Sequence, residues 1–256
     1  GAATARSLAP TAEDGEVRVW ALASKSCTAV LRGHDSAVTA MTLHMDTKTL
    51  VTGGRDRVVS VWDLDTMKAA HSLPVYDTIE GLAVVEPAAA AGDDASKKKR
   101  KSKGAPAAGA GALQRGDLEV VTAGANGQLK RWRIGSGKCV TSEPERAGRV
   151  AYAALLHLPA QGDSQEACLV AVTIENTLLF LRPESLEITK QMVGYNDEVV
   201  DIAFASTEPA VLAVCTNSDH LRLFDTATQS CRLLYGHTVS RPCSSPYCTH
   251  ARTHAR

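Results

Sequence analysis

The chain has 256 residues, of which 44% are apolar, and this suits one large or two small globular domains. Its 28 basic and 28 acidic residues cancel, so the surface as a whole is not built to attract nucleic acid or membranes. No apolar run approaches the roughly 18 residues of a membrane span, and the best one, residues 168–174, suits a buried strand. Seven widely spaced cysteines argue against a disulfide framework and favour a reducing compartment. Because residue 1 is glycine rather than methionine, we expect the natural amino terminus upstream and leave a targeting signal open.

A period of about 42 residues organises the chain. An acid or amide stands six residues before a tryptophan in three places: Asp14 and Trp20, Asp56 and Trp62, Asn126 and Trp132. A cysteine stands seven residues after an aromatic residue in three places: Trp20 and Cys27, Trp132 and Cys139, Phe224 and Cys231. Gly-His begins such a unit and Trp-Asp ends it, which resembles the WD-repeat pattern of four strands per β-propeller blade. Residues 1–33 are predicted to form a partial blade, its second to fourth strands.

The first complete unit begins at His34 and reads as four short strands at residues 37–43, 49–54, 58–64 and 68–75. These runs are rich in apolar and β-branched residues and are separated by turn residues, whereas helical periodicity is hard to find anywhere. The predicted fold class is therefore all-β: an incomplete WD-repeat β-propeller of about four whole blades and a partial one. Residues 34–238 would supply the blades of one propeller or of a junction between two.

Four polar residues of this unit match the hydrogen-bonded set that WD repeats bury within a blade: His34, Thr52, Asp56 and Trp62. The carboxylate in the turn can accept one imidazole N–H and so fix the tautomer. The other imidazole nitrogen can accept the threonine hydroxyl, whose oxygen receives the indole N–H. A network with every buried polar atom partnered stabilises one strand register, so we interpret this structural tetrad as architectural.

A catalytic interpretation of Asp56 with His34 would need a nucleophile and an open cleft. Thr52 is the only hydroxyl that the pattern brings near, and we expect it to face the blade interior. The sequence therefore predicts no catalytic residues, no cofactor and no small-molecule substrate. Blades that lack members of the tetrad are expected to depend on apolar packing alone. Asn126 replaces the aspartate in the next blade, and Val75 and Tyr76 replace its Gly-His.

An insertion lengthens the interval between Trp62 and Trp132. Residues 86–116 are rich in alanine and glycine and are predicted to be disordered. Six cations lie within it: Lys97, Lys98, Lys99, Arg100, Lys101 and Lys103. Two interpretations remain open, a solvated loop or a run for nuclear localisation or RNA binding.

Two further segments imitate known sites. GSGKC at residues 135–139 resembles part of a phosphate-binding loop, but Trp132 stands where a glycine is needed, so a hairpin turn is predicted. Cysteines and histidines gather in the tail, residues 239–256, at Cys243, Cys248, His250 and His254. One residue between the second cysteine and first histidine leaves no room for a finger helix, so no metal site is predicted. We interpret this tail as disordered or artefactual.

Longer runs carry a more specific resemblance. Residues 26–41, 53–64, 71–85, 194–204 and 221–238 resemble the transducin beta-like protein 3 family, across nearly all of residues 7–238. That family is the WD-repeat subunit of the UTP-B subcomplex of the small-subunit processome, associated with U3 small nucleolar RNA. The resemblance implies tandem propellers, of which this chain holds a part. We expect a fragment that is open, or strained into a ring, with exposed edge strands, and that aggregates in isolation.

The resemblance also implies a function. It indicates a non-enzymatic nucleolar scaffold in ribosome biogenesis that supports processing of pre-18S ribosomal RNA. Its implied partners are other WD-repeat subunits, with pre-ribosomal RNA and U3 RNA bound directly or indirectly, and no membrane. The alternative is a WD-repeat adaptor in another complex, such as a ubiquitin ligase, a chromatin complex or a signalling assembly.

Overall fold

A computed structural model describes most of the chain. The described residues are 6–8, 13–87, 114–143, 150–158, 167–192, 197–204, 211–225, 228 and 230–236, with side chains from residue 13 onward. Two compact units are separated between Tyr195 and Asn196. The basic run, the tail and most of the predicted insertion lie outside the described residues.

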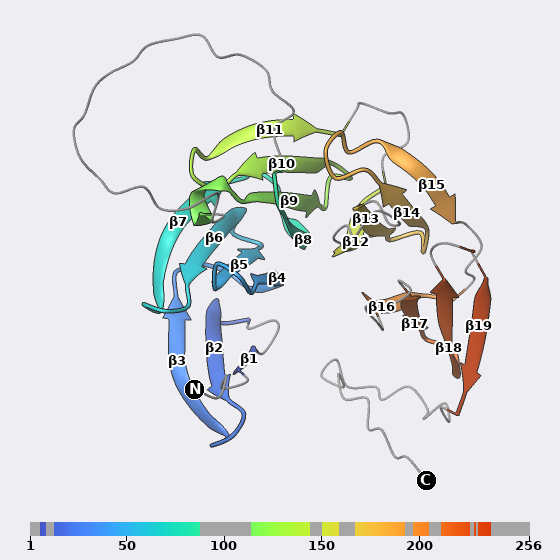
Figure 1. Cartoon of the computed structure of the whole chain (residues 1–256), viewed down its shortest axis with the longest axis horizontal. Coiled ribbons are helices and arrows are strands. Elements are labelled where there is room, and N and C mark those ends of the chain that lie inside the picture. Colours follow the sequence, from blue (N-terminus) through green and yellow to red (C-terminus); the bar gives the residue numbers. More distant parts are fainter. Residues whose placement is uncertain are drawn as a thin grey trace, which may run out of the picture. The chain divides into compact units, whose positions relative to one another are not determined.

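Each sheet of the first unit is an antiparallel meander, in which successive strands are neighbours (Figure 1). A three-stranded sheet comprises β1 (Arg6–Leu8), β2 (Glu16–Ala21) and β3 (Ser26–Arg32). The next sheet comprises β4 (Val38–His44), β5 (Thr49–Gly54), β6 (Val58–Asp63) and β7 (Lys68–Pro74). The third comprises β8 (Ile79–Val85), β9 (Glu119–Gly124), β10 (Leu129–Arg133) and β11 (Lys138–Ser142). The fourth comprises β12 (Tyr152–Leu158), β13 (Cys168–Thr173), β14 (Leu178–Leu181) and β15 (Ile188–Met192).

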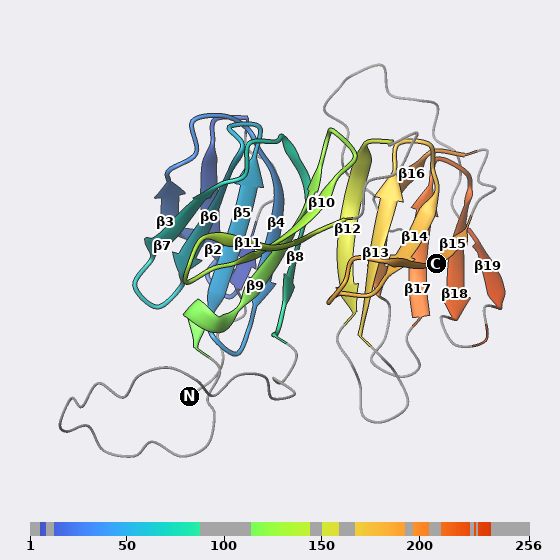
Figure 2. The ribbon, with the colours of Figure 1, turned by 90° about the horizontal axis from the view of Figure 1, so that it is seen from above.

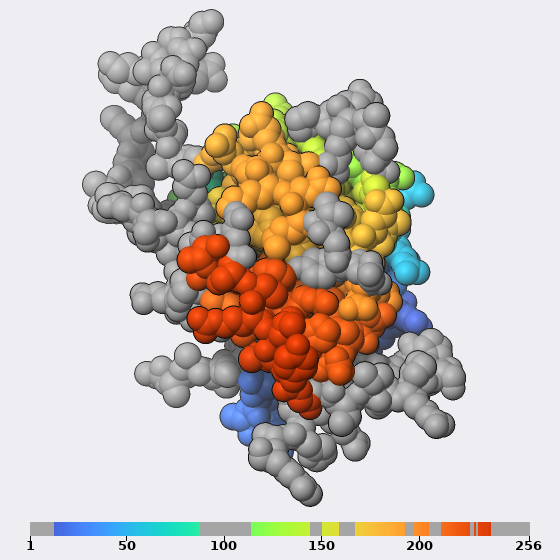
Figure 3. Space-filling view, turned by 90° about the vertical axis from the view of Figure 1, so that its right-hand side faces the viewer, coloured from blue at the N-terminus to red at the C-terminus, as the bar shows by residue number. Residues whose placement is uncertain are grey.

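The second unit holds one further sheet of the same design: β16 (Val199–Phe204), β17 (Val211–Thr216), β18 (His220–Asp225) and β19 (Cys231–Tyr235). Its buried apolar side chains, among the described residues, are Ile202, Leu212, Val214 and Phe224. The edge strand β19, red in Figure 3, exposes all five of its residues. Four four-stranded sheets and a three-stranded one confirm the all-β, WD-repeat class predicted from the 42-residue period.

Strand composition explains how the sheets stack on one another. The second strand of each of three sheets, β5, β9 and β13, is buried along nearly its whole length and is rich in valine, leucine and threonine. Such strands are covered on both faces, so apolar residues need not alternate with polar ones. Outer strands such as β7 and β15 are exposed along most of their length. Figure 2 shows the strands of each sheet side by side from a second direction.

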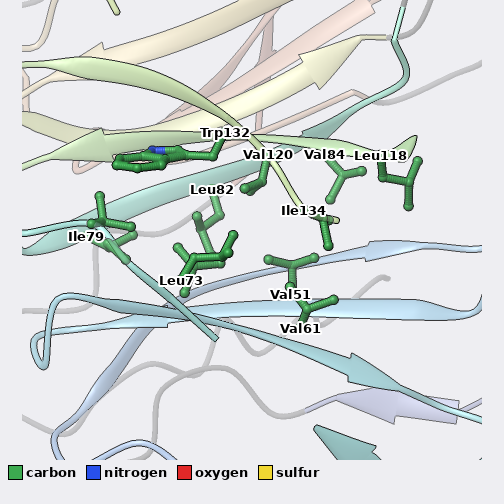
Figure 4. Packing of buried hydrophobic residues seen from close by; sticks show 12 residues of the cluster. Val51, Val61, Leu73, Ile79, Leu82, Val84, Leu118, Val120, Trp132 and Ile134 are labelled. Atoms are coloured by element: carbon green, nitrogen blue, oxygen red, sulfur yellow. The ribbon is translucent and has the colours of Figure 1, made fainter. Parts of the chain in front are cut away.

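A large apolar cluster joins the second and third sheets (Figure 4). Val51 and Val61 contribute from one sheet, and Leu82, Val120 and Trp132 from the other. All five are at least nine-tenths buried. Apolar burial between sheets, at about 25 cal/mol per Å², therefore holds adjacent blades together.

One short 3-10 turn, η1 (Arg115–Asp117), precedes β9. Arg115 and Gly116 belong to the predicted insertion, but the structure places both, and Arg115 contacts the preceding sheet. Arg115 Nη2 lies 3.0 Å from Asp63 Oδ1, and Arg115 Nε donates to Thr49 Oγ1 at 3.0 Å. The carboxyl end of the insertion thus returns to the sheet of β4–β7. Among the described residues, no helix is long and apolar enough to cross a membrane.

Candidate functional site

The sheet of β4–β7 brings the four predicted tetrad residues together. His34 lies in the loop before β4, Thr52 on β5, Asp56 in the turn after β5, and Trp62 on β6. Their positions follow from the register, in which Thr52 pairs with Ser60 and Leu50 pairs with Trp62. Gly33 lies close against the indole ring, because a Cβ there would lie 3.0 Å from Trp62 Cη2.

The tetrad forms a continuous chain of short hydrogen bonds. His34 Nδ1 lies 2.7 Å from Asp56 Oδ2, and His34 Nε2 lies 2.7 Å from Thr52 Oγ1. Trp62 Nε1–H donates to the same hydroxyl oxygen at 2.8 Å. The His34 side chain is 0% exposed and that of Asp56 is 8% exposed. The most economical assignment has Nδ1–H donated to the carboxylate and Nε2 accepting the Thr52 hydroxyl.

Backbone amides occupy the remaining capacity of the Asp56 carboxylate. Oδ2 accepts the Asp35 N–H at 3.2 Å, and Oδ1 accepts the Val58 N–H at 3.1 Å. The turn carrying Asp56 places Arg57 at φ 66°, in the left-handed region. One carboxylate therefore links the loop before β4 to the turn between β5 and β6.

This geometry favours the architectural interpretation of Asp56. Both ring nitrogens of His34 are engaged within the blade, so neither is free to accept a proton from a bound molecule. Thr52 is fully buried, as the sequence predicted. We propose that the tetrad stabilises the register of β5 and β6 rather than performing chemistry.

The prediction that incomplete blades depend on apolar packing alone is wrong for the sheet of β8–β11. Trp132 Nε1 donates to Thr122 Oγ1 at 3.2 Å, which reproduces half of the tetrad. Asn126 Nδ2 donates to Asp77 Oδ1 at 2.8 Å, so an amide and a carboxylate replace the aspartate and imidazole. The sequence could have identified Thr122, because Thr122 follows Thr52 by the same interval that separates Trp62 from Trp132.

A buried ion pair in this sheet was also missed. Glu119 is 0% exposed, and its carboxylate accepts from Arg131 Nε and from Arg133 Nη2, the latter at 2.9 Å. Arg131 Nη1 donates to the backbone oxygens of Pro183 and Glu184, each at 2.9 Å. The pair therefore bridges the third and fourth sheets, a role that no local sequence pattern indicates.

The other predicted segments have separate outcomes. Residues 134–137 form the turn between β10 and β11, which confirms a hairpin at GSGKC instead of a phosphate-binding loop before a helix. The cations at residues 97–103 and the cysteines and histidines of the tail lie outside the described residues. Their predicted roles therefore stay predictions.

Comparisons with known proteins agree with this geometry. The family model described as "WD domain, G-beta repeat" matches residues 25–63, which hold the whole tetrad. The chain belongs to the WD-repeat family. Transducin beta-like protein 3 of Bos taurus is 35% identical over 234 residues, covering 90% of this chain and 26% of that protein. The Homo sapiens protein of the same name is 31% identical over 220 residues, covering 85% of this chain and 24% of that protein.

A less similar relative matches a smaller part of the chain. The CCR4-associated factor 4 homolog of Candida glabrata is 28% identical over 133 residues, covering half of this chain and 19% of that protein. The chain spans about a quarter of the length of the transducin beta-like relatives. The similarity to those relatives extends through nearly all of the WD-repeat blades, well beyond the matched repeat.

Proposed function

We propose that this WD-repeat chain is part of a non-enzymatic scaffold of the small-subunit processome, supporting the processing of pre-18S ribosomal RNA in the nucleolus. One observation carries the proposal: similarity to proteins named transducin beta-like protein 3 over about 90% of the chain. The resemblance of five separate runs, in one order, supports the same family.

The chemistry of the described blades is compatible with a scaffold. Polar side chains in their interiors bond to one another, as in the tetrad and in the Glu119–Arg131 pair. Sheets stacked on such interiors present rigid surfaces and loops to partners, and the fold by itself does not select the partner. Selection must then come from exposed loops and from segments such as the basic run.

Affinity purification from nucleolar extract tests the proposal. A tagged chain is expected to co-purify with other processome WD-repeat subunits and with U3 and pre-18S RNA. A deletion of residues 97–103 tests the cationic run, and a deletion of residues 104–110, an uncharged segment of equal length beside it, is the matched control. If the cations contact RNA, recovery of RNA falls only in the first deletion and falls steeply with salt in the intact chain.

The outcomes separate the hypotheses. If both deletion variants recover processome proteins and neither changes the recovery of RNA, the scaffold proposal is retained and the RNA contact is rejected. Enrichment of a ubiquitin ligase, chromatin or signalling complex without processome subunits would replace the proposal by the adaptor function. The partial similarity to the CCR4-associated factor 4 homolog is the observation that keeps this second function in view.

A further inference from the structure

Three consecutive sheets bring metal-ligating side chains to the same ends of their inner strands. His44 is the last residue of β4, Glu86 follows the last residue of β8, and His157 is next to last in β12. β8 packs against both β4 and β12, so the three strand ends are neighbours. Asp46, in the turn after β4, completes the group. We call His44, Asp46 and Glu86 the rim cluster.

The rim cluster has the dimensions of a coordination site. One ligand atom from each of its residues lies within 4.8 Å of the other two. His44 Nε2 lies 3.3 Å from Glu86 Oε1. These residues and His157 line a cavity of about 370 Å³ that opens between β4, β8 and β12. An imidazole with carboxylates is a donor set that zinc accepts in proteins.

The neighbours of His44 leave its Nε2 lone pair for a cation. Thr49 Oγ1 accepts from Arg115 Nε at 3.0 Å and donates to the Thr47 carbonyl at 3.2 Å. The Thr47 hydroxyl donates to Thr49 Oγ1 at 2.9 Å, so Thr47 Oγ1 is left as an acceptor for His44 Nδ1–H at 2.9 Å. The backbone N–H of Thr47 can also donate to Nδ1, at 3.4 Å, and this longer hydrogen bond is lost when Nδ1 carries the proton. A hydrogen bond from the far nitrogen is how metal-binding histidines are oriented.

His157 is the second, independent observation at this cavity. Its Nε2 is buried and has no hydrogen-bond partner among the described residues. Burial lowers the pKa of His157, and a hydrogen bond to the Val84 backbone opposes that shift. A buried imidazole nitrogen without a hydrogen-bond partner is an unsatisfied polar atom, and imidazole is a common metal ligand.

We propose that the rim cluster binds one zinc ion through His44 Nε2 and the carboxylates of Asp46 and Glu86, with His157 Nε2 completing the site after its side chain turns toward the ion. His44 and Asp46 come from one blade, Glu86 from the next and His157 from the third. The bound ion clamps three successive inner strands at one edge. This role is independent of the processome assignment.

Zinc titration of the purified chain by calorimetry tests the site. The background carries Cys243→Ser, Cys248→Ser, His250→Gln and His254→Gln, because tail thiols and imidazoles would bind zinc by themselves. One ion per chain is expected. Glu86→Gln and His44→Gln are each expected to weaken binding by at least about tenfold, and Thr47→Val by about 10- to 100-fold through His44.

Controls make the result decisive. Glu86 has a side chain that is 61% exposed, so glutamine should fit without disturbing the fold. Glu175→Gln changes an exposed turn glutamate of the fourth sheet and is expected to leave zinc affinity unchanged. Zinc should also slow hydrogen exchange at the ends of β4 and β8 in the background chain but not in Glu86→Gln. Absence of saturable binding, or equal affinity in the background, His44→Gln and Glu86→Gln chains, would overturn the proposal and leave a simple His44–Glu86 ion pair.

Discussion

Replacing Thr52 by valine is the sharpest test of the tetrad, because valine keeps the shape of threonine and removes only the hydroxyl. That oxygen contacts His34 Nε2 at 2.7 Å and Trp62 Nε1 at 2.8 Å. Thr52 is 0% exposed and Trp62 is 2% exposed, so water cannot replace the lost partner. The variant therefore leaves one buried acceptor and one buried donor unsatisfied.

The expected cost follows from these two groups. Each unsatisfied buried polar atom costs about 1–3 kcal/mol, which gives about 2–6 kcal/mol for the pair. A buried methyl group in place of the hydroxyl returns about 0.8 kcal/mol. The free energy of unfolding should thus fall by about 1–5 kcal/mol, a large part of the roughly 5–15 kcal/mol typical of a folded protein.

Thr122→Val is the matched control within the same molecule. Thr122 occupies the equivalent position in the sheet of β8–β11, and its hydroxyl accepts from Trp132 Nε1 at 3.2 Å without an imidazole. Only one buried group loses its partner, so the expected loss is about 0–2 kcal/mol. Urea unfolding followed by tryptophan fluorescence measures both variants, and hydrogen exchange in β5 and β6 localises the effect. A Thr52→Val loss within about 0.5 kcal/mol of the Thr122→Val loss would refute the reasoning.

Three further predictions concern packing, charge and thiol reactivity. Gly53→Ala places a Cβ 2.8 Å from Ile79 Cγ2, so overpacking should cost about 1–3 kcal/mol in urea unfolding, whereas Gly116→Ala, whose nearest neighbour lies at 3.7 Å, should cost less. Arg131→Met removes one partner of the buried Glu119 and should cost about 3–5 kcal/mol, and substituting Glu119 by methionine as well should restore part of it; an unchanged single variant would contradict this. Burial raises the pKa of Cys168 to about 11 from its ordinary 9.0, which lowers its thiolate population at pH 8 by about 100-fold. Mass spectrometry should find Cys168 alkylated far more slowly than the exposed Cys27, with a rate that rises as pH approaches 11; equal rates at pH 8 would contradict the burial.

The fold class could be predicted from the sequence because the period of about 42 residues is marked by residue types that recur from blade to blade. The six-residue spacing of Asp56 and Trp62 spans one turn and one strand, so it reports the hairpin of β5 and β6 directly. The tetrad contacts were predictable for the same reason: all four residues lie in one blade and its entry loop. Their stabilising role remains a prediction until Thr52→Val is measured.

The polar contacts that were missed follow a different rule. Glu119 and Arg131 lie within one sheet, but the reason to bury them is the pair of carbonyls at Pro183 and Glu184 in the next one. A pattern confined to one repeat carries no information about such a bridge. The prediction of apolar packing alone around Asn126 was wrong for a related reason. Its partner Asp77 follows Tyr76, which stands where the histidine is missing, so Asp77 lies one residue outside the family pattern.

The period nevertheless predicts which positions become neighbours between blades. His44 and Glu86 are 42 residues apart, one period, and they meet because equivalent inner-strand ends of adjacent blades lie side by side. A repeat thus fixes proximity across blades, while the identity of the side chains decides whether proximity becomes a bond. At the tetrad the repeat specifies both the proximity and the identity of the side chains, since the WD-repeat pattern contains all four residues. At the strand ends of β4, β8 and β12 it specifies only the proximity, because the imidazoles and carboxylates there are not part of the repeat pattern.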